Sequence, residues 1–291
     1  MDYKDFSSIN SVDTLYGFLE EKKLTHTKYC YYSAIKGIDS ILENQFFWLS
    51  SACLVNDRKE SNTENEFFLC LSATDSENIP MWYLYGGIDG QGARITFKKS
   101  LLIRWLSDIE KKSMVYLVKY KDSNYDEILE KVPLDYSVRC SEVLYLSSYE
   151  DDSSCRIKYN NHSNYLFAKE KYQELCERFK GAVKAVPWFY EKEFRIIVTV
   201  QNSIAELIKR DNCYKVVLSF PDDIMSDLDI MTGPEQTEDI DTSVLKGFSK
   251  YLQKKIHKSR YTGEIEMGLR KRMCDYCNRN NPDDEKIAMH I

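Results

Sequence analysis

The stretch from Trp188 to Val200 constrains the fold more than any other part of this chain. Its residues alternate between charged and apolar types, which is typical of a β-strand, because successive side chains of a strand point to opposite faces. The alternation puts Glu191, Glu193 and Arg195 on one face and the apolar Phe194 on the other. Two carboxylates and a guanidinium are costly to bury unless they are paired. The charged face is therefore solvent-exposed, salt-bridged, or the lining of a polar cleft.

Apolar spacing along the rest of the chain predicts a mixture of helices and strands. Helical periodicity predicts helices at residues 11–22, 35–43, 165–180 and 244–257. Runs rich in aromatic and β-branched residues predict strands at residues 29–33, 46–50, 67–71, 93–97, 114–120 and 214–220. The elements do not alternate as they do in a doubly wound sheet, so the predicted class is α+β. Glycine and proline are few, at 11 and 6 residues, which predicts one continuous domain over residues 1–291.

The cysteines indicate a reducing compartment. The nine cysteines are scattered, and several lie in apolar surroundings, so a cytoplasmic protein is predicted rather than a disulfide framework. The start of the chain is acidic, unlike a signal peptide, and no apolar run approaches the roughly 20 residues that cross a bilayer. Only Cys274 and Cys277 have ligand spacing, with His257 and His290 as further candidates. We predict two unrelated thiols and no metal site, the zinc site being the alternative.

Charge is unevenly distributed over the chain. The net charge of -6 argues against non-specific coating of nucleic acid. An acidic stretch, Asp222–Asp241, precedes a stretch from Lys246 to Arg272 with nine basic and two acidic residues. The basic stretch contains Tyr251 and Tyr261, so it can follow a phosphate backbone and stack bases. The alternative is a solvated helix face beside the acidic stretch. The candidate nucleic-acid contacts are Lys254, Lys255, Lys258 and Arg260.

Two loops are dense in groups that can bind a ligand. Asn56 and Asp57 follow a predicted strand and are typical of a turn or a helix cap. Met81–Gly87 combines aromatic residues with a glycine turn, which also suits a plain core segment. The chain contains no dinucleotide fingerprint, no phosphate-binding loop and no serine nucleophile elbow. Four histidines give little support to a histidine-based triad or a multi-histidine metal site.

The order of these segments resembles a bacterial family of unknown function found in defence and toxin-like loci. Its blocks are a His-Tyr-Thr-Ser element, a Gly-Leu helix, a strand ending in Ser-Ser-Ala, an Asn-Asp-x-x-Glu loop, Met-Trp-x-x-Tyr, a glycine turn with a strand, and Tyr-x-x-Glu-x-Arg. The matching stretches here are Tyr31–Ala34, Gly37–Leu42, Phe47–Ala52, Asn56–Glu60, Met81–Tyr85, Gly90–Phe97 and Tyr190–Arg195. The resemblance covers roughly residues 28–200. Residues 244–291 form a basic C-terminal portion that is expected to be helical.

That family is similar to the ADP-ribosyltransferases, in particular to the DarT-like toxins that modify nucleic acid. The resemblance implies an ADP-ribosyltransferase-like α+β fold, with two small packed sheets and flanking helices around a cleft that holds NAD as co-substrate. Cleavage of the nicotinamide glycosidic bond passes through an oxocarbenium-like state, which a fixed carboxylate stabilises. Glu193 takes that role, and Glu191 orients the acceptor or acts as base toward it.

The resemblance also assigns residues to NAD binding. Arg195 or Arg58 meets the pyrophosphate, and Trp82 and Tyr85 stack on the nicotinamide or adenine, or frame the cleft. The remaining assigned residues are Tyr31, Ser33 and Asn56. Tyr31 stands where the family usually has histidine, and its hydroxyl can still hydrogen-bond a ribose.

The function expected from the resemblance is that of a NAD-consuming ADP-ribosyltransferase, a toxin of phage defence whose acceptor is RNA or DNA, with RNA favoured. The closest analogues are mRNA-modifying members of toxin–antitoxin–chaperone systems, so an antitoxin protein is a candidate partner. Two alternatives stay open. One is a protein-modifying transferase on the same fold, and the other is a non-catalytic binding module or antitoxin-like partner.

Overall fold

The structure is a computed structural model, and it describes most of the chain. The described residues are 11–21, 24–52, 64–87, 90–148, 154–159, 162–168, 171–241, 243–251 and 256–263. They form helices and three β-sheets, so the predicted α+β class is confirmed. Two small packed sheets were expected. The described residues instead form three sheets, and the largest has eight strands.

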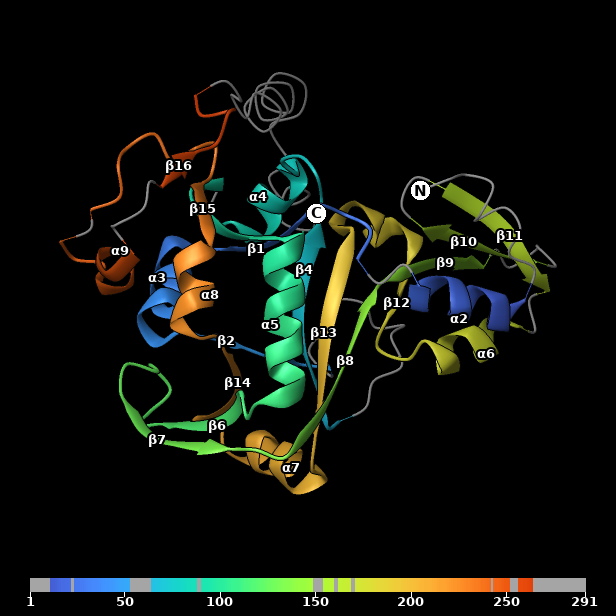
Figure 1. Ribbon diagram of the computed structural model, residues 1–291, viewed down its shortest axis with the longest axis horizontal. Helices are drawn as coiled ribbons and strands as arrows, with labels where there is room; N and C mark the ends of the chain where they lie inside the picture. The colour runs from blue at the N-terminus through green and yellow to red at the C-terminus, as the bar shows by residue number, and fades with distance from the viewer. Residues whose placement is uncertain are drawn as a thin grey trace, which may run out of the picture.

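The main sheet runs through the middle of the molecule (Figure 1). Its strand order is β16–β15–β5–β1–β4–β13–β8, with β3 also paired to β4. Neighbours are antiparallel except for β15 and β16. The strands are β1 (Lys28–Ser33), β3 (Ser50–Ser51), β4 (Glu66–Ala73), β5 (Ala93–Lys98), β8 (Tyr136–Glu142), β13 (Glu193–Val200), β15 (Asp229–Thr232) and β16 (His257–Lys258).

The main sheet divides between β1 and β4. These two strands pair only at Tyr29↔Ala73 and Cys30↔Ser72. In contrast, β1 pairs with β5 along its whole length, and β4 pairs with β13 from Glu66 to Ser72. Beyond Cys30 the sheet therefore separates into two arms, β16–β15–β5–β1 and β4–β13–β8, with an opening between them.

Two smaller sheets flank the main one (Figure 1). The second sheet has the antiparallel order β2–β14–β6–β7, with β2 (Phe46–Trp48), β14 (Tyr214–Ser219), β6 (Val115–Tyr120) and β7 (Ile128–Pro133). Only Leu49 separates β2 from β3, so this stretch passes from the second sheet into the main sheet. The third sheet has the order β11–β10–β9–β12, with β9 (Leu144–Ser148), β10 (Ser154–Tyr159), β11 (His162–Ala168) and β12 (Val183–Ala185).

Helices cover these sheets. In Figure 1, α5 lies across the main sheet, α3, α8 and α9 lie beside it, and α2 and α6 lie under the third sheet. The described helices are α2 (Val12–Glu21), α3 (Ile35–Asn44), α4 (Ile79–Tyr85), α5 (Lys99–Lys111), α6 (Lys171–Arg178), the 3₁₀ turn η3 (Val186–Glu191), α7 (Asn202–Arg210), α8 (Asp222–Asp227) and α9 (Lys246–Tyr251). Gly247 lets α9 approach α3 closely, because a Cβ there would lie 2.0 Å from the Asp39 carbonyl oxygen.

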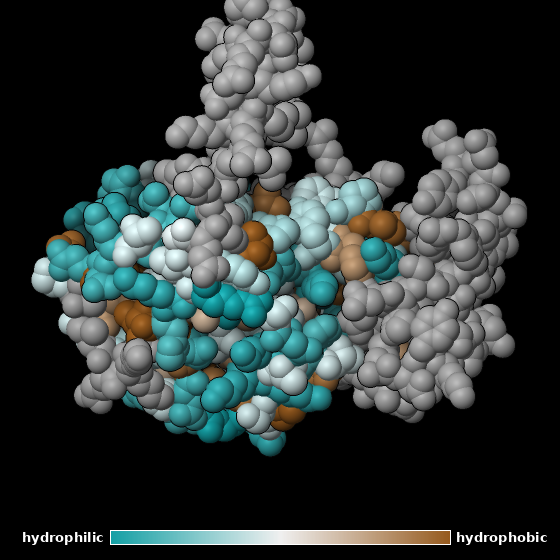
Figure 2. Space-filling view, turned by 90° about the horizontal axis from the view of Figure 1, so that it is seen from above, coloured by the Kyte–Doolittle hydropathy of each residue, from teal (hydrophilic) through white to brown (hydrophobic). Residues whose placement is uncertain are grey.

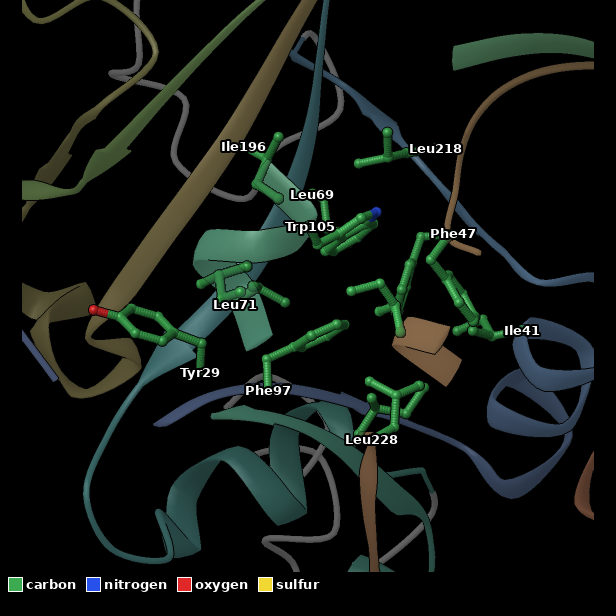
Figure 3. Close-up of a cluster of buried hydrophobic side chains, with 14 of the residues drawn as sticks. Tyr29, Ile41, Phe47, Leu69, Leu71, Phe97, Trp105, Ile196, Leu218 and Leu228 are labelled. Atoms are coloured by element: carbon green, nitrogen blue, oxygen red, sulfur yellow. The ribbon is translucent and has the colours of Figure 1, made fainter. Parts of the chain in front are cut away.

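The main core fills the space between the main sheet, the second sheet and α5. Phe97 stacks on Trp105 with ring centres 5.1 Å apart, and Phe47 packs against both rings (Figure 3). A separate small core joins the third sheet to α2 and α6 through Leu15 and Leu175. The third sheet therefore has its own small hydrophobic core, and the chain connects it to the main sheet between β8 and β9 and between β12 and β13.

Figure 2 shows one face of the molecule, on which polar residues predominate and apolar residues are scattered. Scattered apolar residues are ordinary on protein surfaces. Within the described residues, no helix combines the length and the apolar character needed to span a membrane.

Several predicted elements are wrong in part. The helix predicted at 165–180 begins only at Lys171, because the preceding residues pair with β10 as strand β11. The strand predicted from Trp188 begins at Glu193. Pro187 lacks the backbone N–H that a central strand requires, so this stretch forms a 3₁₀ turn instead. The strand predicted at 46–50 breaks at Leu49 into β2 and β3.

The basic C-terminal portion is less helical than predicted. Within the described residues its helix covers only Lys246–Tyr251, and His257–Lys258 form a short strand instead. That strand pairs in parallel with β15, and this pairing overrides the local helical preference. Residues 264–291, including Cys274 and Cys277, lie outside the described part.

Candidate functional site

The charged residues of β13 meet the turn before it at the floor of the opening. Lys192 adopts a left-handed conformation, with φ 46°, between the 3₁₀ turn and β13. This kink separates Glu191 from the strand. The Glu191 carboxylate is nevertheless linked to Glu193 and Arg195 through shared ion pairs. The three residues predicted to share a face are therefore brought together, although Glu191 is not in the strand.

A fourth residue, Lys184 of β12, links the two carboxylates. Its Nζ lies 2.6 Å from Glu191 Oε2 and 2.8 Å from Glu193 Oε2. Arg195 Nε lies 2.7 Å from Glu193 Oε1, and Arg195 Nη2 donates to Glu193 Oε2 at 3.1 Å. Exposure is 5% or less for each of the four residues. Two cations and two anions leave this ion cluster neutral, which is the condition under which buried charges are tolerated.

Glu193 is held firmly as an ion. Burial by itself raises the pKa of its carboxyl, but the charges of Arg195 and Lys184 outweigh burial and hold the pKa well below the usual range. The Glu193 backbone N–H donates to the Tyr145 hydroxyl at 2.9 Å. The Glu193 charge, in turn, adds to burial in raising the pKa of the Cys70 thiol. Glu193 therefore stays ionised and fixed over the physiological range.

Glu191 is in a different electrostatic state. It accepts hydrogen bonds from the Tyr85 hydroxyl and from Lys184. Burial raises the pKa of its carboxyl, Lys184 opposes that rise, and the nearby Glu193 charge adds to it, so the pKa is raised overall. Two neighbouring carboxylates whose pKa values are pushed apart are suited to different roles in acid–base chemistry.

Sequence reasoning missed Lys184 and Tyr145, which reach the site from the third sheet. They lie opposite one another in the parallel pair β9–β12. Burial lowers the pKa of Lys184, but the charges of Glu193 and Glu191 outweigh it and raise the pKa overall. The one local signal for Lys184 was its place between the apolar residues Val183 and Ala185, which favours burial. A buried lysine requires a charged partner, so this position could have indicated an ion pair.

The opening above the ion cluster contains a cleft of about 230 Å³. Residues from both arms of the main sheet and from β2–β3 line it, together with the ion cluster. They include Tyr31 and Tyr32 of β1, Cys70 and Ser72 of β4, Trp48 and Ser50, and Tyr85 of α4. A small cleft with convergent charges and aromatic walls is the usual form of a ligand site.

Backbone groups also face this opening. The Lys28 carbonyl accepts a hydrogen bond from the Thr74 backbone N–H, which follows β4. In a strand every second residue directs its backbone N–H and C=O to the same side, so Cys30 and Tyr32 also direct theirs toward β4. Pairing with β4 ends at Cys30, so the backbone N–H and C=O of Tyr32 face the opening. Along β4, the backbone of Ser72 faces β1, so the backbone of Cys70, two residues earlier, also faces this side. The Cys70 peptide group therefore faces the opening from the other arm.

The remaining predicted NAD contacts lie in different places. Tyr31 lines the cleft with its ring edge-on to Phe47 at 5.1 Å, and burial raises its pKa to about 12. Trp82 is fully buried behind Tyr32, with ring centres 4.8 Å apart, and does not line the cleft. Ser33 ends β1 outside the cleft lining. Asn56 and Arg58 lie outside the described residues.

Two of the predicted nucleic-acid contacts, Lys258 and Arg260, lie at the edge of the main sheet. Lys258 pairs with Asp239 of the acidic stretch at 2.9 Å. Arg260 is 3.9 Å from Glu77 and lies over the Tyr261 ring. Acidic neighbours therefore offset the charge of both residues. Lys254 and Lys255 lie outside the described residues.

Comparison of the chain with protein-family models, with curated proteins and with solved structures finds no match.

Proposed function

We propose that this protein is a NAD-dependent ADP-ribosyltransferase. The observation that carries the proposal is the divided main sheet, whose opening holds two buried carboxylates in different protonation environments. A split sheet around a cleft is the arrangement that the resemblance to the ADP-ribosyltransferases implies. The proposal includes an ADP-ribosyltransferase-like fold.

The cleft suits the reactive end of NAD. Small-molecule sites usually occupy about 300–1,000 Å³, so a cleft of about 230 Å³ accommodates the nicotinamide and its ribose and not the whole dinucleotide. The peptide groups of Tyr32 and Cys70 face this space and offer both a donor and an acceptor to a carboxamide. Tyr31 supplies a neutral hydroxyl to the ribose, since burial keeps it protonated.

The two carboxylates divide the chemistry between them. Glu193 is ionised at every physiological pH, so it provides a fixed negative charge toward a sugar carbon that becomes positive as the glycosidic bond breaks. Glu191, with its raised pKa, accepts a proton from the attacking group of the acceptor. Lys184 and Arg195 hold both carboxylates in place and keep the cluster neutral before the substrate enters.

The alternative that a specific observation favours is a non-catalytic binding module. Both carboxylates of the ion cluster are already paired with cations, and such clusters also occur as structural devices. A protein-modifying transferase would use the same cleft with another acceptor. The proposed ADP-ribosyltransferase is a toxin with RNA as its favoured acceptor and an antitoxin protein as its partner.

Incubation of the purified protein with labelled NAD and total RNA, DNA or lysate protein separates these functions. Label in the RNA fraction supports the proposal, and label in the protein fraction supports the protein-modifying alternative. If no fraction is labelled and expression leaves growth unchanged, the enzyme proposal fails and the binding module stands.

A further inference from the structure

The second sheet, β2–β14–β6–β7, has two unlike faces. Phe47, Val216 and Leu218 project from one face into the main core. Neighbouring residues of a strand point to opposite faces, so Trp48 and Lys215 project from the other. Cross-strand register puts Tyr116, Tyr120 and Lys131 beside them, and the connection between β6 and β7 adds Tyr125. We call this second face the platform, and its defining residues are Trp48, Tyr116, Tyr120, Tyr125, Lys131 and Lys215.

The aromatic rings of the platform are fixed against one another. Trp48 lies edge-on to Tyr125 at 4.9 Å and to Tyr120 at 5.6 Å, and its indole N–H donates to the Tyr120 hydroxyl at 2.8 Å. Even so, 37% of Trp48 is exposed, and Tyr116 and Tyr125 are partly exposed. Rings that are already oriented lose little conformational entropy when a flat ligand stacks on them.

The platform is also positively charged. Lys215 Nζ lies 4.7 Å from the Tyr125 ring centre and 5.7 Å from that of Trp48, and Lys131 Nζ lies 4.3 Å from that of Tyr116. Within the described part of the chain, neither ammonium forms an ion pair with a carboxylate. This differs from Lys258, which Asp239 already neutralises. The lysine stem is long and flexible, so each ammonium can leave the ring face to a base and move to a phosphate of the same ligand.

We propose that the platform binds single-stranded nucleic acid, with bases stacked on its aromatic rings and phosphates against Lys131 and Lys215. Bases in a duplex are already stacked on each other, so the platform favours unpaired strands. Trp48 lines the catalytic cleft as well as the platform, so a strand bound here leads into the opening. This inference rests on the proposed function, for which it supplies the acceptor-docking surface.

Fluorescence anisotropy with a labelled single-stranded RNA of about 12 nucleotides, without NAD, tests the platform. Tyr125→Ala should weaken binding about 5- to 150-fold, the equivalent of one lost stacking contact. Tyr125→Phe, which keeps the ring, should bind like the wild type. Lys215→Glu should weaken binding and lower the slope of log affinity against log salt by about 0.7, because one phosphate contact is lost. A duplex of the same sequence should bind more weakly than the single strand.

Lys258→Glu is the matched control, because it reverses a lysine that is already paired with a carboxylate. The platform is refuted if Lys258→Glu weakens binding more than Lys215→Glu, if the duplex binds as well as the single strand, or if no RNA binds. Nicotinamide release from NAD, measured in parallel, separates the two proposals. Loss of RNA binding with release retained fits the platform, whereas RNA binding without any release overturns the transferase and leaves the platform standing.

Discussion

Replacing Lys184 with methionine removes the ammonium that bridges Glu191 and Glu193, and it keeps a chain of similar length. The two carboxylates then face Arg195 alone, so one net negative charge is left among groups that are 5% exposed or less. Removing one partner of a buried ion pair typically costs about 3–5 kcal/mol. For a chain of this size the loss corresponds to a melting temperature about 5–8 °C lower.

The loss should depend on pH. Without Lys184, burial and the Glu193 charge both raise the pKa of Glu191, and the strongest influence that lowers it is gone, which leaves the weaker effect of the hydrogen bond from Tyr85. A carboxyl that binds its proton more tightly in the folded state stabilises the fold at low pH, and that stability falls as the pH rises from its unfolded pKa to its folded pKa. Lys184→Met should therefore be destabilised less at about pH 5 than at about pH 8.

Urea unfolding of the wild type, Lys184→Met and Lys184→Arg at both pH values measures this effect. Lys184→Arg keeps the positive charge and should lose less stability. Lys258→Met removes an exposed lysine and should change the free energy of unfolding by no more than about 0.5 kcal/mol. An equal free energy of unfolding for Lys184→Met and the wild type at about pH 8, or a loss that does not vary with pH, would refute the reasoning.

Three further changes test separate parts of the structure. Glu193→Gln leaves Arg195 and Lys184 without their shared anion, so unfolding in urea should show a loss of about 3–5 kcal/mol; wild-type stability would mean that the cluster is not buried. Tyr85→Phe removes the hydroxyl that donates to Glu191, so the acidic limb of the pH–rate profile should move to higher pH; an unchanged limb would exclude Glu191 as the titrating base. Gly247→Ala forces a Cβ against the Asp39 carbonyl, and calorimetry should show about 1–3 kcal/mol of destabilisation, whereas Gly17→Ala, where nothing lies near the added Cβ, should not.

Local patterns predicted β1, β4, β5 and most of β13 in the main sheet, but they predicted neither β8 nor β15. The strands near 67–71 and 93–97 lie where they were expected. The predicted helix at 165–180 was partly wrong, because pairing of β11 with β10 decides the conformation of its first residues. Such pairing is not visible in a window of sequence.

The candidate site was predicted only in part for a similar reason. Glu191, Glu193 and Arg195 are close in sequence, so their convergence follows from local geometry. Lys184 reaches them because β12 pairs with β9 of another sheet, and that contact depends on the tertiary structure. Trp82 was expected in the cleft as an aromatic residue beside glycines, but it is fully buried and packs edge-on behind Tyr32, a placement that depends on tertiary contacts.

The most direct test of the central claim is the release of nicotinamide from NAD by the purified wild type and by Glu193→Gln. Circular dichroism should first show that both are folded at the assay temperature. We expect release by the wild type and its loss, by a factor of at least about 100, in folded Glu193→Gln, because a fixed charge at the reacting carbon is removed. Equal release by the two folded proteins, or none by the wild type, would contradict the assignment of this opening as a NAD-cleaving site.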